Sequence, residues 1–86
     1  MYIRTVDNEI INSDYVSAFQ FQEVREPEAP RGIIARVGDR DVWLATDLDY
    51  RIASALMSSL FERQAFQAES FDVPAVLEIL AAKAAR

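Results

Sequence analysis

The sequence predicts an α+β fold, in which a four- to five-stranded antiparallel sheet over residues ~2–46 is followed by two C-terminal helices packed on one face of the sheet. Short β-rich runs separated by turn residues fill the first half of the chain, whereas apolar residues in the second half recur at helical spacing. Strands and helices segregated in this way indicate α+β rather than a parallel α/β sheet. With 86 residues, the chain is expected to form a single domain, 1–86, because it is too short for two independent cores.

Each expected strand is bounded by residues that favour turns. The first hairpin turns at Asp7 and Asn8, which tolerate positive φ, and the last turn contains Gly38. The strands are expected at residues 2–6, 9–11, 15–25, 31–37 and 42–45.

Alternation along these strands separates a core face from an outward face, because residues two apart point to the same side. Tyr15, Phe19 and Phe21 are the better core candidates of the long strand. On the next two strands the aliphatic sets are expected to face the helices. These sets are Ile33, Ala35 and Val37 on one strand, and Val42 and Leu44 on the other. Ile34, Arg36, Trp43 and Ala45 then fall on the opposite face.

The first helix is expected over residues 47–66, with Thr46 and Asp49 forming a capping box. Its apolar stripe consists of Leu48, Ile52, Leu56 and Leu60, and Ala53, Met57 and Phe61 widen that stripe. A second helix is expected to begin near Pro74, with Asp72 at its positive end. We expect this helix to place Leu77 and Leu80 in the core and to cover the extra width of the first helix, although a dimer seam would also explain that width.

Several kinds of chemistry are excluded by composition. The chain has no cysteine and no histidine, which removes disulfides, thiolate nucleophiles, and the commonest general base and metal ligand. With only two glycines, no glycine-rich phosphate loop is possible. Paired carboxylates can hold a hard cation, but Asp39 and Asp41 fit a hairpin turn, and Asp47 and Asp49 fit a helix start. We therefore expect no enzyme, no cofactor and no metal site.

The net charge of −5 disfavours direct binding to nucleic acid, which needs a basic surface. Such acidity is ordinary for a bacterial protein, and it would also suit a basic protein partner. The longest weakly polar stretch, residues 52–61, is too short to span a bilayer. The N-terminus does not resemble a signal peptide, because Arg4 and Asp7 interrupt its apolar residues. A soluble, cytoplasmic protein is therefore expected.

The N-terminal strand, turn and strand carry one resemblance to known proteins. Tyr2-Ile3-Arg4-Thr5, followed past a short turn by Ile10-Ile11-Asn12, resembles the start of short uncharacterised bacterial proteins of unknown function. The resemblance covers about the first quarter of the chain. It suggests a bacterial or phage origin and implies no activity and no site residues.

These observations predict a non-enzymatic protein-protein interaction module with a regulatory or structural role, self-associating as a homodimer. Tryptophan and arginine are enriched in interface hot spots, so the outward face of the second hairpin is the expected contact surface. Its candidate residues are Trp43, Arg36, Ile34, Arg4 and Tyr2.

Two alternatives remain open at the level of the sequence. One is an acidic inhibitor of phage type that blocks a basic nucleic-acid-binding protein through a stripe of carboxylates. That stripe would involve Glu23, Glu26, Glu28, Asp39 and Asp41. The other is a small metal-dependent enzyme that uses the paired aspartates.

Overall fold

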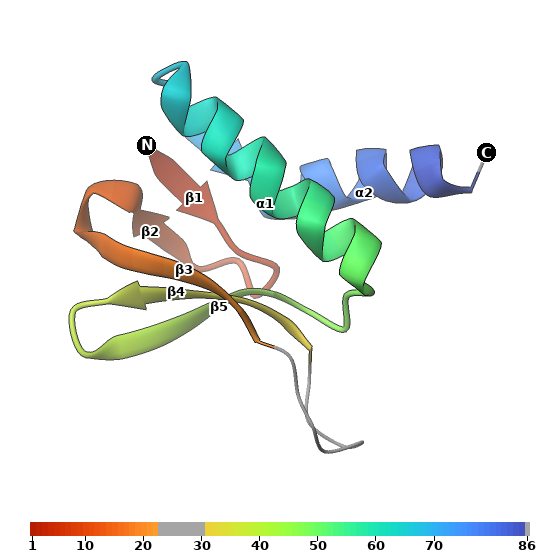
Figure 1. Ribbon diagram of the computed structural model, residues 1–86. Helices are drawn as coiled ribbons and strands as arrows, with labels where there is room; N and C mark the ends of the chain where they lie inside the picture. The colour runs from red at the N-terminus through yellow and green to blue at the C-terminus, as the bar shows by residue number, and fades with distance from the viewer. Residues whose placement is uncertain (23–30, 86) are drawn as a thin grey trace.

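The computed structural model describes residues 1–22 and 31–85 of the chain. Its elements are β1 (Tyr2–Arg4), β2 (Ile10–Asn12), the 3-10 helix η1 (Ser13–Tyr15), β3 (Val16–Gln22), β4 (Gly32–Val37), β5 (Arg40–Thr46), α1 (Tyr50–Ala65), β6 (Ser70–Asp72) and α2 (Val73–Ala84). Both helices lie on the same side of the sheet formed by β3, β4 and β5 (Figure 1). The predicted α+β class is confirmed. None of the described helices is both long enough and apolar enough to cross a membrane.

The strands form two three-stranded sheets, and the prediction of one sheet of four or five strands is therefore wrong. Sheet A has the order β2-β1-β6, and sheet B has the order β3-β4-β5. The division occurs at η1, where the Asn12 side chain accepts a hydrogen bond from the Asp14 amide at 3.0 Å. This capped turn redirects the chain, so β2 and β3 belong to different sheets although they are consecutive. The two sheets meet where the Val6 amide donates to the Leu44 carbonyl at 3.0 Å.

Sheet A contains the predicted first hairpin and a strand that the sequence did not reveal. β1 pairs antiparallel with β2, and Asn8 adopts the expected positive φ of 64° in the turn between them. β6 pairs parallel with the other edge of β1, which places Phe71 opposite Ile3. Because β6 has only three residues, it is too short to show the alternation by which strands are identified.

Sheet B contains the predicted second hairpin, and most side chains of that hairpin lie on the predicted face of the sheet. β4 pairs antiparallel with both β3 and β5. Ile33 and Ala35 are buried, whereas Ile34 lies opposite Trp43 on the other face. The prediction that the aliphatic residues of this hairpin point into the core is therefore confirmed. One residue on β5 departs from the predicted alternation.

That exception and a second one follow from register shifts in sheet B. A shift between Ile33 and Ile34 breaks the alternation on β5, and Ala45 is fully buried instead of facing outward with Trp43. A second register shift, between Val16 and Ala18, breaks the alternation of side chains on β3. Tyr15, expected in the core, lies in η1 before this shift and is 71% exposed.

Helix α1 begins at Tyr50, three residues later than predicted. Asp47 has φ 58°, in the left-handed region, and therefore cannot belong to a right-handed helix. The N-cap is Asp49, whose side chain accepts a hydrogen bond from the Ile52 amide at 2.9 Å. The predicted capping box that begins at Thr46 is thus wrong, although the helix itself is confirmed.

Helix α2 starts where Pro74 and Asp72 predicted it. Asp72 is the N-cap and accepts a hydrogen bond from the Ala75 amide at 3.3 Å. α2 packs against α1, as the apolar stripes of the two helices indicated. Leu77 and Leu80 are only half-buried. The prediction placed them in the core, whereas the structure places them at its border, packed against the buried cluster.

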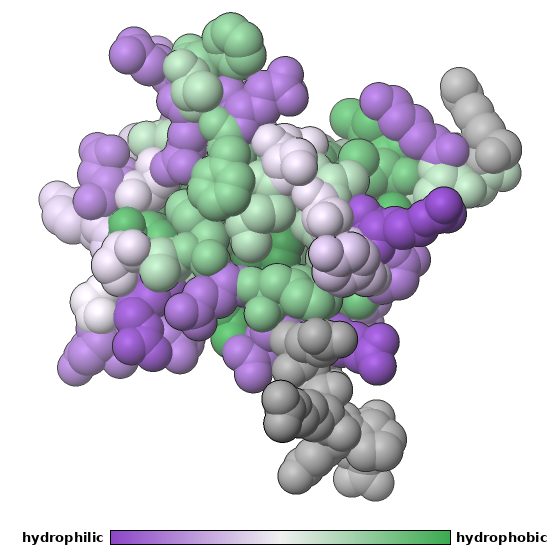
Figure 2. Space-filling view, viewed as in Figure 1, coloured by the Kyte–Doolittle hydropathy of each residue, from purple (hydrophilic) through white to green (hydrophobic). Residues whose placement is uncertain are grey.

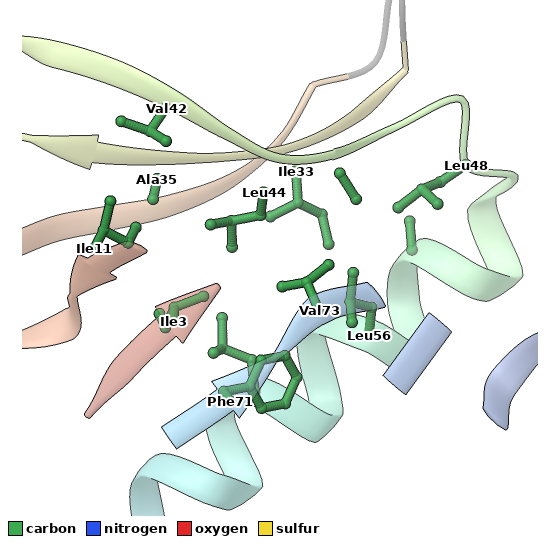
Figure 3. Packing of buried hydrophobic residues seen from close by; sticks show 13 residues of the cluster. Ile3, Ile11, Ile33, Ala35, Val42, Leu44, Leu48, Leu56, Phe71 and Val73 are labelled. Atoms are coloured by element: carbon green, nitrogen blue, oxygen red, sulfur yellow. The ribbon is translucent and has the colours of Figure 1, made fainter. Parts of the chain in front are cut away.

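The core is one cluster of buried residues drawn from both sheets and both helices. In Figure 3, Ile33 and Leu44 of sheet B point towards Leu56 of α1 and Val73 of α2. Ile3 of β1 is fully buried in the same cluster. The inner face of sheet B is therefore covered by α1, by the start of α2 and by β1.

Candidate functional site

Sheet B has two outer edges, on β3 and on β5, and each of these strands is seven residues long. The Val6 amide donates to Leu44 on the β5 edge, whereas no backbone hydrogen bond from the described residues reaches the β3 edge. β3 is seven residues long, stands at the end of sheet B and pairs only with β4 among the described strands. Its sequence, VSAFQFQ, contains no charged residue and no proline. Exposed edge strands are normally protected from pairing with other chains by lysine, proline or a covering element, and β3 carries neither of those residues.

The inner face of β3 meets one flank of α1 through aromatic residues. Phe19 packs edge-to-face on Phe61, with ring centroids 6.1 Å apart. Phe21 packs in the same way on Tyr50, with ring centroids 5.7 Å apart. Such pairs contribute about 0.5–1.5 kcal/mol beyond the burial of their area. They hold α1 beside the unpaired edge, with its N-terminal end at Phe21 and its C-terminal half at Phe19.

A shallow pocket of about 220 Å³ lies between the two elements, lined by Phe21, Tyr50, Ala53, Ser54 and Met57. On α1 these lining residues follow one flank at helical spacing, and Phe61 continues that flank by one turn. We call the whole area the β3–α1 surface. It consists of Phe19, Phe21, Tyr50, Ser54, Met57 and Phe61.

The β3–α1 surface exposes large apolar groups to solvent. Tyr50 is 71% exposed and Phe61 is 51% exposed. Figure 2, in the same view as Figure 1, shows hydrophobic residues through the middle of this face, over α1 and towards β3, with hydrophilic residues around them. An exposed apolar area with a polar border is typical of a protein-contact surface.

Three of the predicted contact residues lie together on the outward face of sheet B. Ile34 is directly opposite Trp43, and Arg36 is directly opposite Asp41. Ile34 and Trp43 are half-buried. The exposed Arg36 side chain forms an ion pair with Asp41 at 3.0 Å, and the hydrogen bonds that Arg36 donates to the Asp41 carboxylate raise the pKa of Arg36. These residues therefore present a smaller apolar area than the sequence suggested.

The other two predicted contact residues, Tyr2 and Arg4, lie on sheet A. They share the outer face of β1, where Arg4 donates two hydrogen bonds at 2.9 Å to the two carboxylate oxygens of Asp72. This pairing holds the pKa of Asp72 below its ordinary value. The five predicted residues are thus divided between two sheets, with Tyr2 and Arg4 on sheet A and the other three on sheet B.

The paired aspartates have structural partners or turn positions. Asp41 pairs with Arg36, Asp49 caps α1, and Asp47 occupies the left-handed bend before that cap. Residues 1–22 and 31–85 contain no group of three or more side chains that could hold a metal ion. The described carboxylates therefore offer a cation no ready set of ligands.

The carboxylate stripe expected of an acidic inhibitor can be followed only in part. Glu23, Glu26 and Glu28 lie outside the described residues. Of the remaining two candidates, Asp41 is paired with Arg36. Nearby Arg40 is ion-paired with Glu9. Both signs of charge are thus interleaved beside the β4–β5 turn.

Comparison with protein-family models, curated proteins and solved structures gave no match.

Sequence reasoning missed the β3–α1 surface although it identified most of its residues. Phe19 and Phe21 were assigned to the core, and Met57 and Phe61 were recognised as extra width on the first helix. The sequence did contain a signal for this surface. Tyr50 lies eleven residues, about three helical turns, before Phe61, so it extends the widened apolar stripe along the same flank of the helix. α2 covers the opposite flank, where Ser59 and Arg63 border a pocket shared with Val76 and Leu80.

Proposed function

We propose that this chain works by binding a protein rather than by catalysing a reaction, and that the β3–α1 surface is its contact surface. The observation that carries the proposal is the combination of an uncharged, unpaired strand edge with two exposed aromatic side chains beside it. The edge offers backbone hydrogen bonds and the aromatic rings offer apolar area. Together they are the two components of recognition by strand addition.

The chemistry of the surface also supports binding over catalysis. The pocket beside Phe21 and Tyr50 is lined by aromatic and aliphatic groups and a single serine, Ser54. An activated serine needs a neighbouring base, and the residues lining this pocket include none. The geometry therefore supports a role that depends on shape and apolar area.

Photo-crosslinking in cells that produce the chain would test this proposal. A benzophenone amino acid replaces Phe61, which is 51% exposed in the β3–α1 surface, or Ile79, which is 56% exposed on α2 and serves as a matched control. We expect discrete protein adducts from position 61 and not from position 79. Equal labelling at both positions, or no adduct at position 61, would overturn the proposal.

A further inference from the structure

We propose that the partner bound by the β3–α1 surface is a second copy of the same chain. The inference rests on the proposed function and adds a specific geometry. The two β3 strands pair antiparallel about a two-fold axis at Gln20, so that two copies of sheet B become one six-stranded sheet. Two-fold dimers are the commonest form of self-association, and they require a surface that is complementary to itself.

An antiparallel register centred on Gln20 pairs the two phenylalanines of β3 with each other across the axis. It places Phe19 of one copy opposite Phe21 of the partner subunit, and it does so twice because of the symmetry. Aromatic pairs facing each other on neighbouring antiparallel strands are favourable. On the other side of the sheet the same register places Gln20 opposite its own symmetry mate and Ala18 opposite Gln22 of the partner subunit. None of these pairs brings like charges together, because β3 contains no charge.

The same register brings the two α1 helices together in a complementary way. Phe61 packs on Phe19, and Tyr50 packs on Phe21. When Phe19 faces the partner's Phe21, Phe61 therefore approaches the partner's Tyr50. The four aromatic residues of each copy then form one continuous cluster across the axis.

Charges next to these aromatic residues agree with this arrangement. Arg51 follows Tyr50 and Glu62 follows Phe61, and both are exposed on the face of α1 that borders the Tyr50–Phe61 flank on the side away from the core. Among the described residues neither has an ion-pair partner within its own chain. The two-fold axis places Arg51 beside Glu62 of the partner subunit, and it repeats the opposite-charge pair on the other side.

The exposed aromatic rings supply part of the area that a specific dimer needs. Tyr50 is 71% exposed and Phe61 is 51% exposed, which corresponds to about 250 Å² of ring surface per copy if an aromatic side chain offers about 200 Å². Two copies supply about 500 Å², roughly a third of a standard interface of about 1,600 Å². In the proposed dimer the remainder has to come from the edges of both β3 strands and the adjoining surfaces of both α1 helices.

Analytical ultracentrifugation of the purified chain over a wide range of concentrations tests the geometry. We expect the wild type to be a dimer, and Gln20→Lys to raise its dissociation constant at least roughly tenfold, because two lysines then meet at the axis. Gln22→Lys is the matched control, since it adds the same charge on the same strand opposite Ala18 of the partner subunit. This control should remain dimeric, and circular dichroism should show both variants to be folded.

A charge exchange between α1 helices provides an independent test. Arg51→Glu alone and Glu62→Arg alone each place like charges together twice, and each should raise the dissociation constant on the order of tenfold. An equimolar mixture of the two variants restores opposite charges at both positions. The mixture should therefore form a heterodimer with an affinity near that of the wild-type dimer.

Three results would overturn the self-pairing. The first is a wild type that stays monomeric at every concentration; discrete adducts of Phe61 with another protein would then leave the proposed function standing. The second is a dimer that is unaffected by Gln20→Lys but dissociated by the double variant Trp43→Ala, Arg36→Glu, which would place the contact on the outward face of sheet B. The third is a mixture of the two α1 charge variants that is no more dimeric than either variant alone.

Discussion

Replacing Leu56 by alanine tests the central packing of the fold. Leu56 is 1% exposed and lies on the inner stripe of α1 with Ala53 and Leu60. In Figure 3 it lies with Val73 beneath Ile33 and Leu44 of sheet B. The substitution removes most of a side chain that bridges the helix layer and the sheet.

The expected loss of stability is large for a chain of this size. Truncation of a buried leucine to alanine costs about 2–5 kcal/mol, because the lost burial is joined by a cavity that the surroundings only partly fill. For 86 residues the total free energy of unfolding is roughly 4–13 kcal/mol. A cost of about 3 kcal/mol would lower the Tm by roughly 12–24 °C.

Urea denaturation followed by two probes would measure this effect. Far-UV circular dichroism reports mainly on the helices, and the fluorescence of Trp43, the only tryptophan, reports on sheet B. The measurements should be made in the Gln20→Lys background, because self-association would otherwise add a concentration-dependent contribution to stability. Leu80→Ala, at a half-buried position, is the comparison and should cost about 1–2 kcal/mol, since less burial is lost.

Coincident transitions by both probes are expected, because α1 and sheet B share one core. A cost for Leu56→Ala no greater than that for Leu80→Ala would refute the packing argument. Helix unfolding well before the change in Trp43 fluorescence would show that α1 is not held by sheet B.

Three further predictions concern backbone space, pH and metal ions. Gly32→Ala should destabilise the fold by roughly 1–3 kcal/mol in urea titrations, because a Cβ at this position would collide with the Ala45 carbonyl on the neighbouring strand; an unchanged urea midpoint would contradict this. The pKa of Asp72 is lowered in the folded state by its hydrogen bonds from Arg4, so its stabilising effect is present above the unfolded pKa of about 4 and is lost as pH falls through the lower folded value. The difference in urea midpoint between the wild type and Asp72→Asn should therefore shrink below about pH 4, and a constant difference would show that the pairing does not contribute. Thermal melts with EDTA and with excess magnesium should coincide, whereas a higher Tm with magnesium would reveal a native-state site.

The elements that the sequence predicted well are those defined by local signals. The hairpin turns at Asn8 and Gly38 have the positive φ that their residue types allow, and α2 starts at the cap and proline that mark a helix start. The aliphatic alternation on β4 correctly identified Ile33 and Ala35 as core residues. Each of these features depends on residues within a few positions of one another.

The errors concern relations between distant segments or small departures from regularity. Whether consecutive strands share a sheet depends on non-local pairing, and here β1 pairs with a strand from residues 70–72 instead of extending towards β3. Single register shifts moved Ala45 into the core and left Tyr15 outside it. The capping box failed because a serine- or threonine-type cap signal at Thr46 competes with an equally good cap at Asp49, and the backbone at Asp47 decides between them.

The contact surface could not be placed from strand patterning alone, since patterning concerns the faces of a sheet and β3 is distinguished by its edge. Charged residues make up 27% of the chain, yet the seven residues of β3 include none, and its solvent-facing positions are Ser17, Gln20 and Gln22. A single charge at Gln20 would be harmless in a monomer and would even protect the edge from unwanted pairing. In a two-fold strand pairing the same charge would meet itself at the axis. An uncharged residue at Gln20 is therefore what the proposed dimer requires, and it is the opposite of what protection of a monomeric edge would favour.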